Sequence, residues 1–132
     1  MPIAADVLAY NQKQTTEDQV ICNWLAETIE TALPEAEGKV WHGHPVWFID
    51  KNPVVGYHRQ KDSVRILFWS GQSFGDSTLK AIGSFKAAGL AIESVESFDA
   101  QAFAQQLQKS RTIQWDYANL PKKKELEKLT EF

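Results

Sequence analysis

Apolar residues recur at helical spacing in the first quarter of the chain. Spacings of three and four positions bring side chains onto one side of a helix, and this stripe is what an amphipathic helix buries. Thr15 and Thr16 offer hydroxyls that can cap the start of such a helix, and Pro34 ends it. A shorter opening helix is expected over residues 4–12. The residues of the main stripe are Ile21, Trp24, Leu25, Ile29 and Leu33.

The pattern changes at Lys39 to runs rich in β-branched and aromatic residues. Short connections with turn chemistry separate these runs. They are too short for parallel crossovers, so the runs predict an antiparallel meander. In the last run apolar side chains fall on both faces, which predicts a central strand covered on both sides. The four runs span residues 39–42, 45–50, 54–60 and 64–70.

The stretch after the fourth run is harder to assign. Residues 77–83 are ambiguous between helix and loop. The alanines within 85–95 are compatible with a helix, but Gly83 and Gly89 weaken that reading, and we expect a strand there.

A second clear helix is predicted near the end of the chain. Asp99 is a good N-cap residue, and Phe98 and Phe103 have the spacing of a hydrophobic staple across the helix start. Residues 113–117 then alternate between apolar and polar positions, which predicts a short extended segment packed on the body of the protein.

These elements predict an α+β fold in which an antiparallel β-sheet meander is flanked by an N-terminal and a C-terminal helix. A length of 132 residues, with 43% hydrophobic and 23% charged residues, suits one domain with a substantial core. We expect this domain to span residues 1–120 and a charged tail to occupy residues 121–132.

Charge and hydropathy narrow the partners and the location. The formal net charge of −3 argues against nucleic acid as a partner, because phosphate binding needs a basic surface. No stretch approaches the roughly 20 apolar residues that span a bilayer. The start of the chain lacks the basic region of a secretion signal, so we expect a cytoplasmic protein without a membrane partner. Cys22 is the single cysteine, which excludes an intrachain disulfide and a thiolate zinc site.

The segment 71–75 matches the G-x-S-x-G pattern of a hydrolase nucleophile elbow. In that arrangement a histidine later in the chain serves as the base for the serine. Here His42, His44 and His58 all precede Ser73, and the strand before the motif belongs to an antiparallel meander. The motif is therefore interpreted as a glycine-bearing loop, and an enzyme that uses a histidine as general base is only the third hypothesis.

The histidines are the stronger candidates for chemistry. In an extended segment His42 and His44 would share a face at about 6.6–7 Å, and His58 could neighbour them across the sheet. Converging imidazoles at such a spacing can bind one metal ion. Gly43 and Pro45 imply a bend, however, that would separate the directions of the two side chains. The acids that could complete an iron or manganese shell are Glu35, Glu37 and Asp50.

An aromatic cluster accompanies the histidines. Trp41, Trp47, Tyr57 and Trp69 all fall in the predicted strands. They are compatible with core packing, and they are also compatible with an apolar pocket or a stacking platform over a concave sheet.

Several motifs in a fixed order resemble those of the YdhG-like family, a family of short bacterial domains of unknown function. The similarity covers roughly residues 6 to 120. The segments that carry it are Ala32-Leu33-Pro34-Glu35-Ala36-Glu37, Trp41-His42-Gly43-His44-Pro45-Val46-Trp47-Phe48, Asn52-Pro53-Val54-Val55-Gly56-Tyr57, Leu67-Phe68-Trp69-Ser70-Gly71-Gln72-Ser73-Phe74 and Ile113-Gln114-Trp115-Asp116-Tyr117.

The resemblance implies an α+β fold with an antiparallel sheet flanked by helices. Some relatives are described as frataxin-like intracellular iron chaperones that bind iron through acids on the first helix and the adjoining strand. Gly43 and Pro45 match a backbone feature, which points to shape more than to chemistry. The acids of the comparable region here are Glu27, Glu30, Glu35 and Glu37.

The leading hypothesis is a cytoplasmic, non-enzymatic binding module that recognises a small ligand or a protein through the sheet surface. The alternative is a frataxin-like iron-binding protein, with iron as the one cofactor that the sequence suggests. The residues assigned to the binding module are His42, His44, Trp41, Trp47, Tyr57 and Trp69, and those assigned to iron are His42, His44, Glu35 and Glu37.

Overall fold

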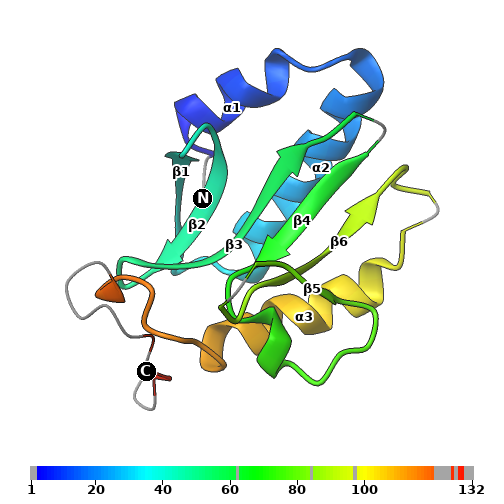
Figure 1. Ribbon diagram of the computed structural model, residues 1–132. Coiled ribbons are helices and arrows are strands. Elements are labelled where there is room, and N and C mark those ends of the chain that lie inside the picture. The colour runs from blue at the N-terminus through cyan, green and yellow to red at the C-terminus, as the bar shows by residue number, and fades with distance from the viewer. Residues whose placement is uncertain are drawn as a thin grey trace.

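The computed structural model describes residues 3–61, 63–83, 85–96, 98–120, 126 and 128–129. Figure 1 shows the arrangement of the elements. The helices are α1 (Ala5–Gln12), α2 (Thr16–Ala32) and α3 (Ala100–Thr112), with a short 3-10 helix, η1, at Gly71–Ser73. The strands are β1 (Glu37–Trp41), β2 (His44–Ile49), β3 (Asn52–Arg59), β4 (Val64–Phe68), β5 (Lys80–Ala81) and β6 (Ala88–Ile92).

The strands form one six-stranded sheet in the order β1-β2-β3-β4-β6-β5, and every neighbouring pair is antiparallel. The first four strands follow chain order, so the predicted meander is confirmed. After β4 the chain first passes along the edge of the sheet as β5 and then returns as β6 between β5 and β4. Together with the helices, this sheet confirms the predicted α+β fold.

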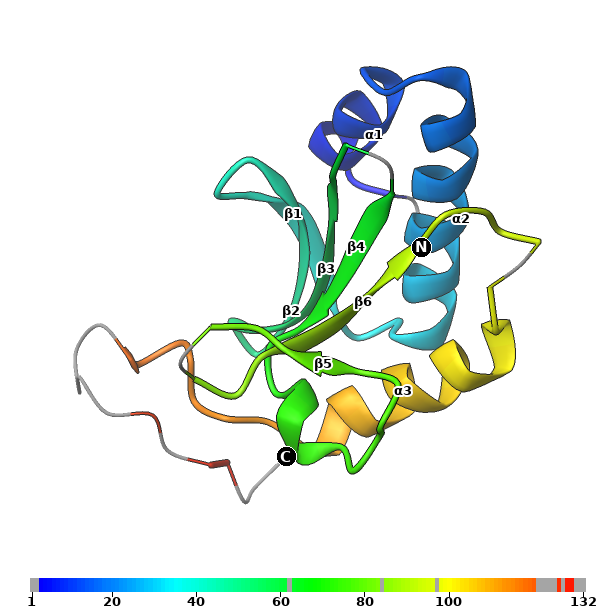
Figure 2. The ribbon, with the colours of Figure 1, turned by 45° about the vertical axis from the view of Figure 1, so that its right-hand side comes forward.

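The three α-helices lie on the same side of the sheet (Figure 2). Each contacts it through a different side chain. The Tyr57 hydroxyl donates a 2.6 Å hydrogen bond to Asn11 of α1, and the Trp47 indole donates one of 3.0 Å to Glu30 of α2. The Phe68 ring packs against a ring of α3, with centroids 6.1 Å apart. We call this side of the sheet the helical face. The core lies between it and the helices, because Trp47, Tyr57 and Phe68 are fully buried there.

The ends of the helices follow the capping chemistry of the sequence. The hydroxyl of Thr15 accepts the backbone N–H of Asp18 at 3.3 Å, and α2 ends shortly before Pro34. The carboxylate of Asp99 accepts the backbone N–H of Ala102 at 3.0 Å. Phe98 and Phe103 pack with ring centroids 5.5 Å apart, which confirms the predicted staple at the start of α3.

The second half of the sheet departs in detail from the expectations. The strand expected within residues 85–95 is confirmed as β6, and the ambiguous stretch 77–83 contains the short strand β5. β4 is central, and its residues alternate between buried and half-buried along the strand. Its buried side chains face the helices. In the described part of the chain no helix covers its other side, so the expected cover on both sides is not found.

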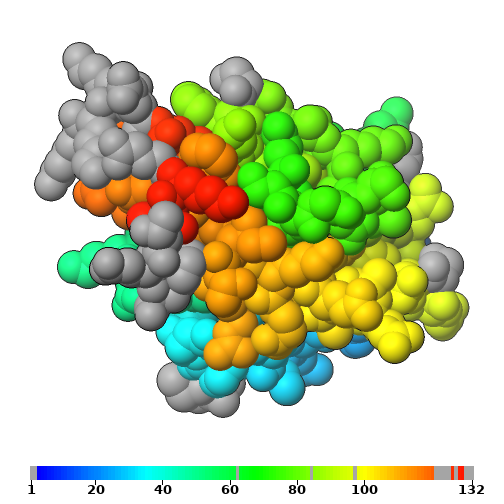
Figure 3. Space-filling model, turned by 90° about the horizontal axis from the view of Figure 1, so that it is seen from below, coloured from blue at the N-terminus to red at the C-terminus, as the bar shows by residue number. Residues whose placement is uncertain are grey.

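The residues after α3 return along the lower side of the molecule. Trp115 donates its backbone N–H to the hydroxyl of Ser70 at 2.9 Å and its indole N–H to that of Ser73 at 3.0 Å. It also forms an isolated antiparallel bridge with Lys128. Figure 3 shows these red and orange residues beside α3 and the green η1 region. Ser73 of the G-x-S-x-G segment thus accepts a hydrogen bond from Trp115. Most of the tail predicted at 121–132 lies outside the described residues.

Candidate functional site

The side of the sheet opposite the helices carries most of the unusual side chains. Alternation along each strand brings every second residue to this side. The register pairs Trp41 with His44 and His58 with Arg65 across neighbouring strands. Figure 2 shows the β1–β2 hairpin curling away from the helices, so this surface is concave. We call it the open face. Its residues are Glu37, Lys39, Trp41, His44, Val46, Phe48, Gly56, His58, Arg65, Leu67, Trp69 and Ile82.

Aromatic rings occupy the β1–β2 end of the open face. The ring of Trp41 lies 5.4 Å from that of Phe48 and 6.3 Å from that of Trp69, between centroids. The Trp69 ring in turn stacks on the His44 ring at 6.5 Å with 27° between the ring planes. All these rings except that of Phe48 remain partly accessible to solvent. They form a platform against which a flat apolar group can stack.

Two glycines leave parts of the open face without side chains. A Cβ atom at Gly56 would lie 2.6 Å from the carbonyl oxygen of Pro45, so a side chain there would push β2 and β3 apart, and it would also crowd the Trp69 ring at 3.3 Å. A Cβ atom at Gly89 would lie 3.0 Å from the end of the Ile82 side chain. These glycines leave a recess in the surface between larger neighbours.

His44 and His58 stand beside this platform with their ring centroids 5.3 Å apart. The Nδ1 atom of His44 is buried and has no hydrogen-bond partner. Burial lowers the pKa of His44 below its usual value. The nearby His58 and His42 lower that pKa further, and a contact with the Pro45 backbone acts in the opposite direction. His44 is therefore a neutral imidazole at pH 7.

Arg65 stands across from His58 on β4 and separates two recesses of the open face. The side-chain oxygen of Gln60, with its amide oriented toward the guanidinium, accepts hydrogen bonds from Nη2 and Nε of Arg65 at 3.0 and 3.2 Å. The first recess has a volume of about 180 Å³ and is lined by His44, Tyr57, His58, Arg65, Leu67 and Ile82. The second has about 360 Å³, and its polar lining is Gln60, Arg65, Thr78 and Lys80.

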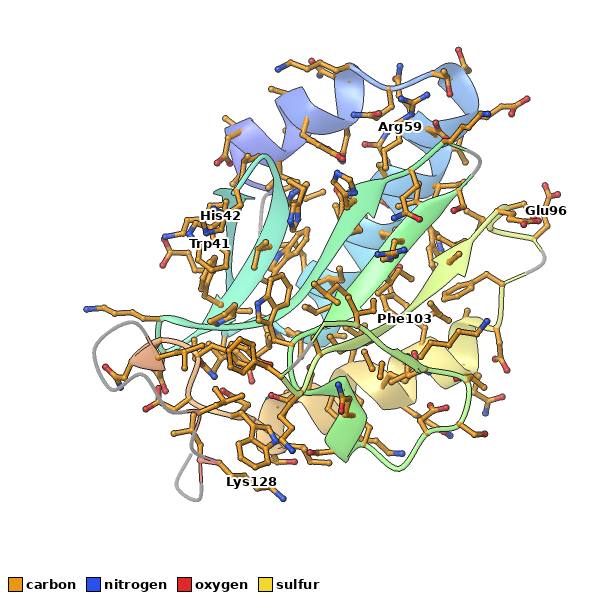
Figure 4. The ribbon with its side chains drawn as sticks, in the orientation of Figure 1. Trp41, His42, Arg59, Glu96, Phe103 and Lys128 are labelled. Carbon is orange, nitrogen blue, oxygen red and sulfur yellow. The ribbon has the colours of Figure 1, made fainter. Side chains whose placement is uncertain are left out.

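The two residues between Trp41 and His44 form the tight turn of the β1–β2 hairpin. His42 and Gly43 both have positive φ angles, 52° and 87°, which is the conformation of a type I′ turn. The His42 side chain is exposed and lies against the Trp41 ring at 4.2 Å between centroids (Figure 4). His42 and His44 therefore do not share an extended face, because the bend expected from Gly43 separates them.

The predicted binding residues divide between the two faces of the sheet. Trp41, His44 and Trp69 lie on the open face. Trp47 and Tyr57 are fully buried on the helical face, where each is hydrogen-bonded to a helix. Arg65 was absent from the predicted set, and His58 entered it only as a possible neighbour of the other histidines. Strand alternation was the signal that pointed to both, but it identifies a face only once the register is known.

The acids assigned to iron lie apart from the histidines. Glu35 pairs with Arg111 at 2.7 Å. Glu37 is paired in register with Phe48, at the far end of β1 from Trp41 and His44, about 13 Å away along the strand. Across the described ranges, no group of three or more His, Cys, Asp or Glu side chains could hold a metal ion. The structure therefore does not bring the predicted metal ligands together.

A larger cavity of about 510 Å³ lies beside the segment that follows α3. Its buried polar groups already have partners. Asn52 donates to the side chain of Gln114 and to the carbonyl oxygen of Trp115, both at 2.9 Å, and accepts from the backbone N–H of Ala118 at 3.0 Å. Asp116 accepts hydrogen bonds from Asn119. This network ties the start of β3 to residues 114–119. We therefore interpret the buried polar groups of this cavity as structural.

Comparisons with known proteins add no relative. No protein-family model matches the chain, and neither a curated protein nor a solved structure matches it. The resemblance to the YdhG-like family therefore stays a prediction. Within the part of the chain that the structure describes, no helix is both long and apolar enough to cross a membrane.

Proposed function

We propose that this protein is a cytoplasmic, non-enzymatic binding module that holds a small planar ligand on the open face of its sheet. The observation that carries the proposal is the row of partly accessible rings of Trp41, His44 and Trp69 beside a recess of the open face. A flat ligand that covers such rings is stabilised, because aromatic pairs contribute about 0.5–1.5 kcal/mol beyond the area that they bury.

The surroundings of His44 suit a flat, mostly apolar compound. Trp69 stacks on one side of the imidazole, and Leu67 and Ile82 line the adjoining recess. Ligand sites commonly combine such an apolar lining with a few polar groups that fix the orientation of the ligand. The recess is small, so we propose a ligand with one or two fused rings.

The proposal is tested with 2-naphthylacetamide, a neutral two-ring compound, in an NMR titration of the 15N-labelled protein. The indole N–H signals of Trp41 and Trp69 should shift together and saturate. The indole N–H of Trp47, which lies on the helical face, serves as the internal control and should stay in place.

Two matched variants locate the binding site. His44→Phe keeps a ring in the stack but removes the nitrogen, and it should weaken binding several-fold. His42→Phe makes the same change on the exposed turn, and the affinity should remain within about twofold of the wild type. If the indole signals of Trp41 and Trp69 do not respond, or if the two variants behave alike, the open face is not the binding site.

The iron-binding alternative has less support. It rests on the resemblance to frataxin-like relatives, whereas Glu35 is engaged with Arg111 and Glu37 lies at the far end of β1. Anaerobic Fe(II) calorimetry compares the wild type with His42→Ala/His44→Ala and with Glu35→Ala/Glu37→Ala. We expect no stoichiometric binding. Micromolar binding that either double variant abolishes would replace the small-ligand proposal with the iron-binding one.

A further inference from the structure

Among the described residues, the two recesses that adjoin Arg65 are lined by basic side chains and by no acidic ones. The two recesses together contain His44, His58, Arg65 and Lys80, and neither is lined by an aspartate or a glutamate among the described residues. The whole chain has 17 acidic residues against 14 lysines and arginines, so this local composition runs against the net charge of −3. A surface of this kind attracts an anion.

Arg65 differs from the other two arginines of the chain in its partner. Arg59 pairs with Asp18 at 2.9 Å, and Arg111 pairs with Glu35 at 2.7 Å. Within the described residues Arg65 has no carboxylate partner. The neutral Gln60 side chain holds it through Nη2 and Nε. A guanidinium has five N–H donors in a planar fork, so Arg65 is held in position and still has donors for a carboxylate.

The rings and the guanidinium lie in one row across the strands. Trp41 neighbours His44, the His44 and His58 rings meet edge to face, and His58 is paired in register with Arg65. Strands are spaced by about 4.8 Å, so His44 on β2 and Arg65 on β4 are about 10 Å apart. A compound lying along this row has its flat end on the aromatic platform and its other end at Arg65.

We propose that the ligand of the open face is an organic anion, a planar apolar compound that carries a carboxylate. Its ring stacks against Trp69 and His44, and its carboxylate accepts hydrogen bonds from Arg65, with His58 as the neighbouring group. The proposal rests on the proposed function and adds the charge of the ligand and its direction in the groove. Because arginine stays protonated, the preference for the anion holds at pH 7.5, where His44 is neutral.

The experiment compares 2-naphthylacetate with 2-naphthylacetamide, which have the same shape and differ in charge. Their dissociation constants are measured at pH 7.5 for the wild type, Arg65→Gln, Arg65→Lys and Arg111→Gln. We expect the wild type to prefer the carboxylate about tenfold. Arg65→Gln should abolish this preference and leave the affinity for the amide within about twofold of the wild type, whereas Arg65→Lys should keep part of it. Arg111→Gln removes the same charge elsewhere and should leave the preference unchanged.

A salt titration of the wild type gives a readout that needs no variant. Added NaCl should weaken binding of 2-naphthylacetate and leave binding of the amide unaffected. Equal affinities for the two compounds in the wild type, or a preference that survives in Arg65→Gln, would overturn the anion proposal while the proposed function stands. If neither compound binds, the proposed function itself fails. A preference that disappears in Arg111→Gln instead would move the anion to the larger cavity and overturn the proposal.

Discussion

At the scale of single residues, the open face depends on a few positions whose neighbours in sequence are buried. His44 precedes buried Pro45, His58 follows buried Tyr57, and Arg65 lies between buried Val64 and Ile66. The sequence indicated His44 and Trp69 as candidate binding residues. It could not place Trp47 and Tyr57 on the other face, because a shift of one residue in strand register exchanges the two faces.

The lowered pKa of His44 predicts how stability depends on pH. The folded protein keeps this imidazole neutral, chiefly through burial, whereas the unfolded chain takes up a proton near the usual pKa of about 6.5. The unfolded state therefore binds more protons below that pH, and the free energy of unfolding falls as pH drops through about 6.5 toward the lowered pKa. Urea unfolding between pH 7.5 and pH 5 should show a steeper decline for the wild type than for His44→Phe.

His42→Phe is the matched control for this measurement, because that side chain is exposed in the hairpin turn. It should retain most of the pH dependence of the wild type, because burial is the chief cause of the lowered pKa of His44 and His42 is the smallest of the causes. Equal slopes for the wild type and His44→Phe would mean that His44 titrates alike in the folded and the unfolded chain.

At the scale of elements, local patterns predicted the helices and the strands well. The stripe of α2, the cap and staple of α3 and the meander of the first four strands all follow from spacing, capping and turn chemistry within short stretches. β5 was missed because it has two residues, and its pairing with β6 supplies what its sequence lacks. The sequence predicted cover on both sides of β4 because both of its faces carry apolar side chains. The apolar side chains of one face belong to the open face instead, where they are only partly buried.

The attachment of α1 to the sheet gives a prediction at this scale. The Tyr57 hydroxyl donates to Asn11, whose own amide donates to Asn23 at 3.0 Å. Tyr57→Phe leaves the oxygen of Asn11 buried without that donor and should lower the free energy of unfolding by about 1–3 kcal/mol. In a double-mutant cycle with Asn11→Leu, urea unfolding should give a coupling energy of about 1 kcal/mol. Strictly additive effects would show that this hydrogen bond does not hold α1 to the sheet.

At the scale of the whole molecule, the helices cover one face of the sheet and leave the other without helical cover among the described residues (Figure 1). Fully buried residues such as Leu25 of α2, Ile66 of β4 and Leu107 of α3 lie on the covered side. The sequence predicted this division only as a class of fold, because the side on which a helix packs depends on contacts between distant segments.

The reactivity of Cys22 measures how readily the core beneath α2 opens. The thiol lies on α2 without exposed surface, and burial raises its pKa to about 12. Reaction with a disulfide reagent therefore requires opening of the core, since the thiolate is the nucleophile. At pH 8 the rate should rise with urea in step with unfolding observed by circular dichroism. Rapid reaction in native buffer, insensitive to low urea, would show that α2 opens on its own.

The alternation along the strands also bears on how this protein can change during evolution. The residues at 44, 58 and 65 are not among the residues of the hydrophobic core, so their replacement can alter what is bound without a matching repair of the hydrophobic interior. A lineage built on this framework can acquire new ligand preferences through single substitutions while the packing of its core is inherited unchanged. Divergence should therefore accumulate on one side of the sheet and conservation on the other.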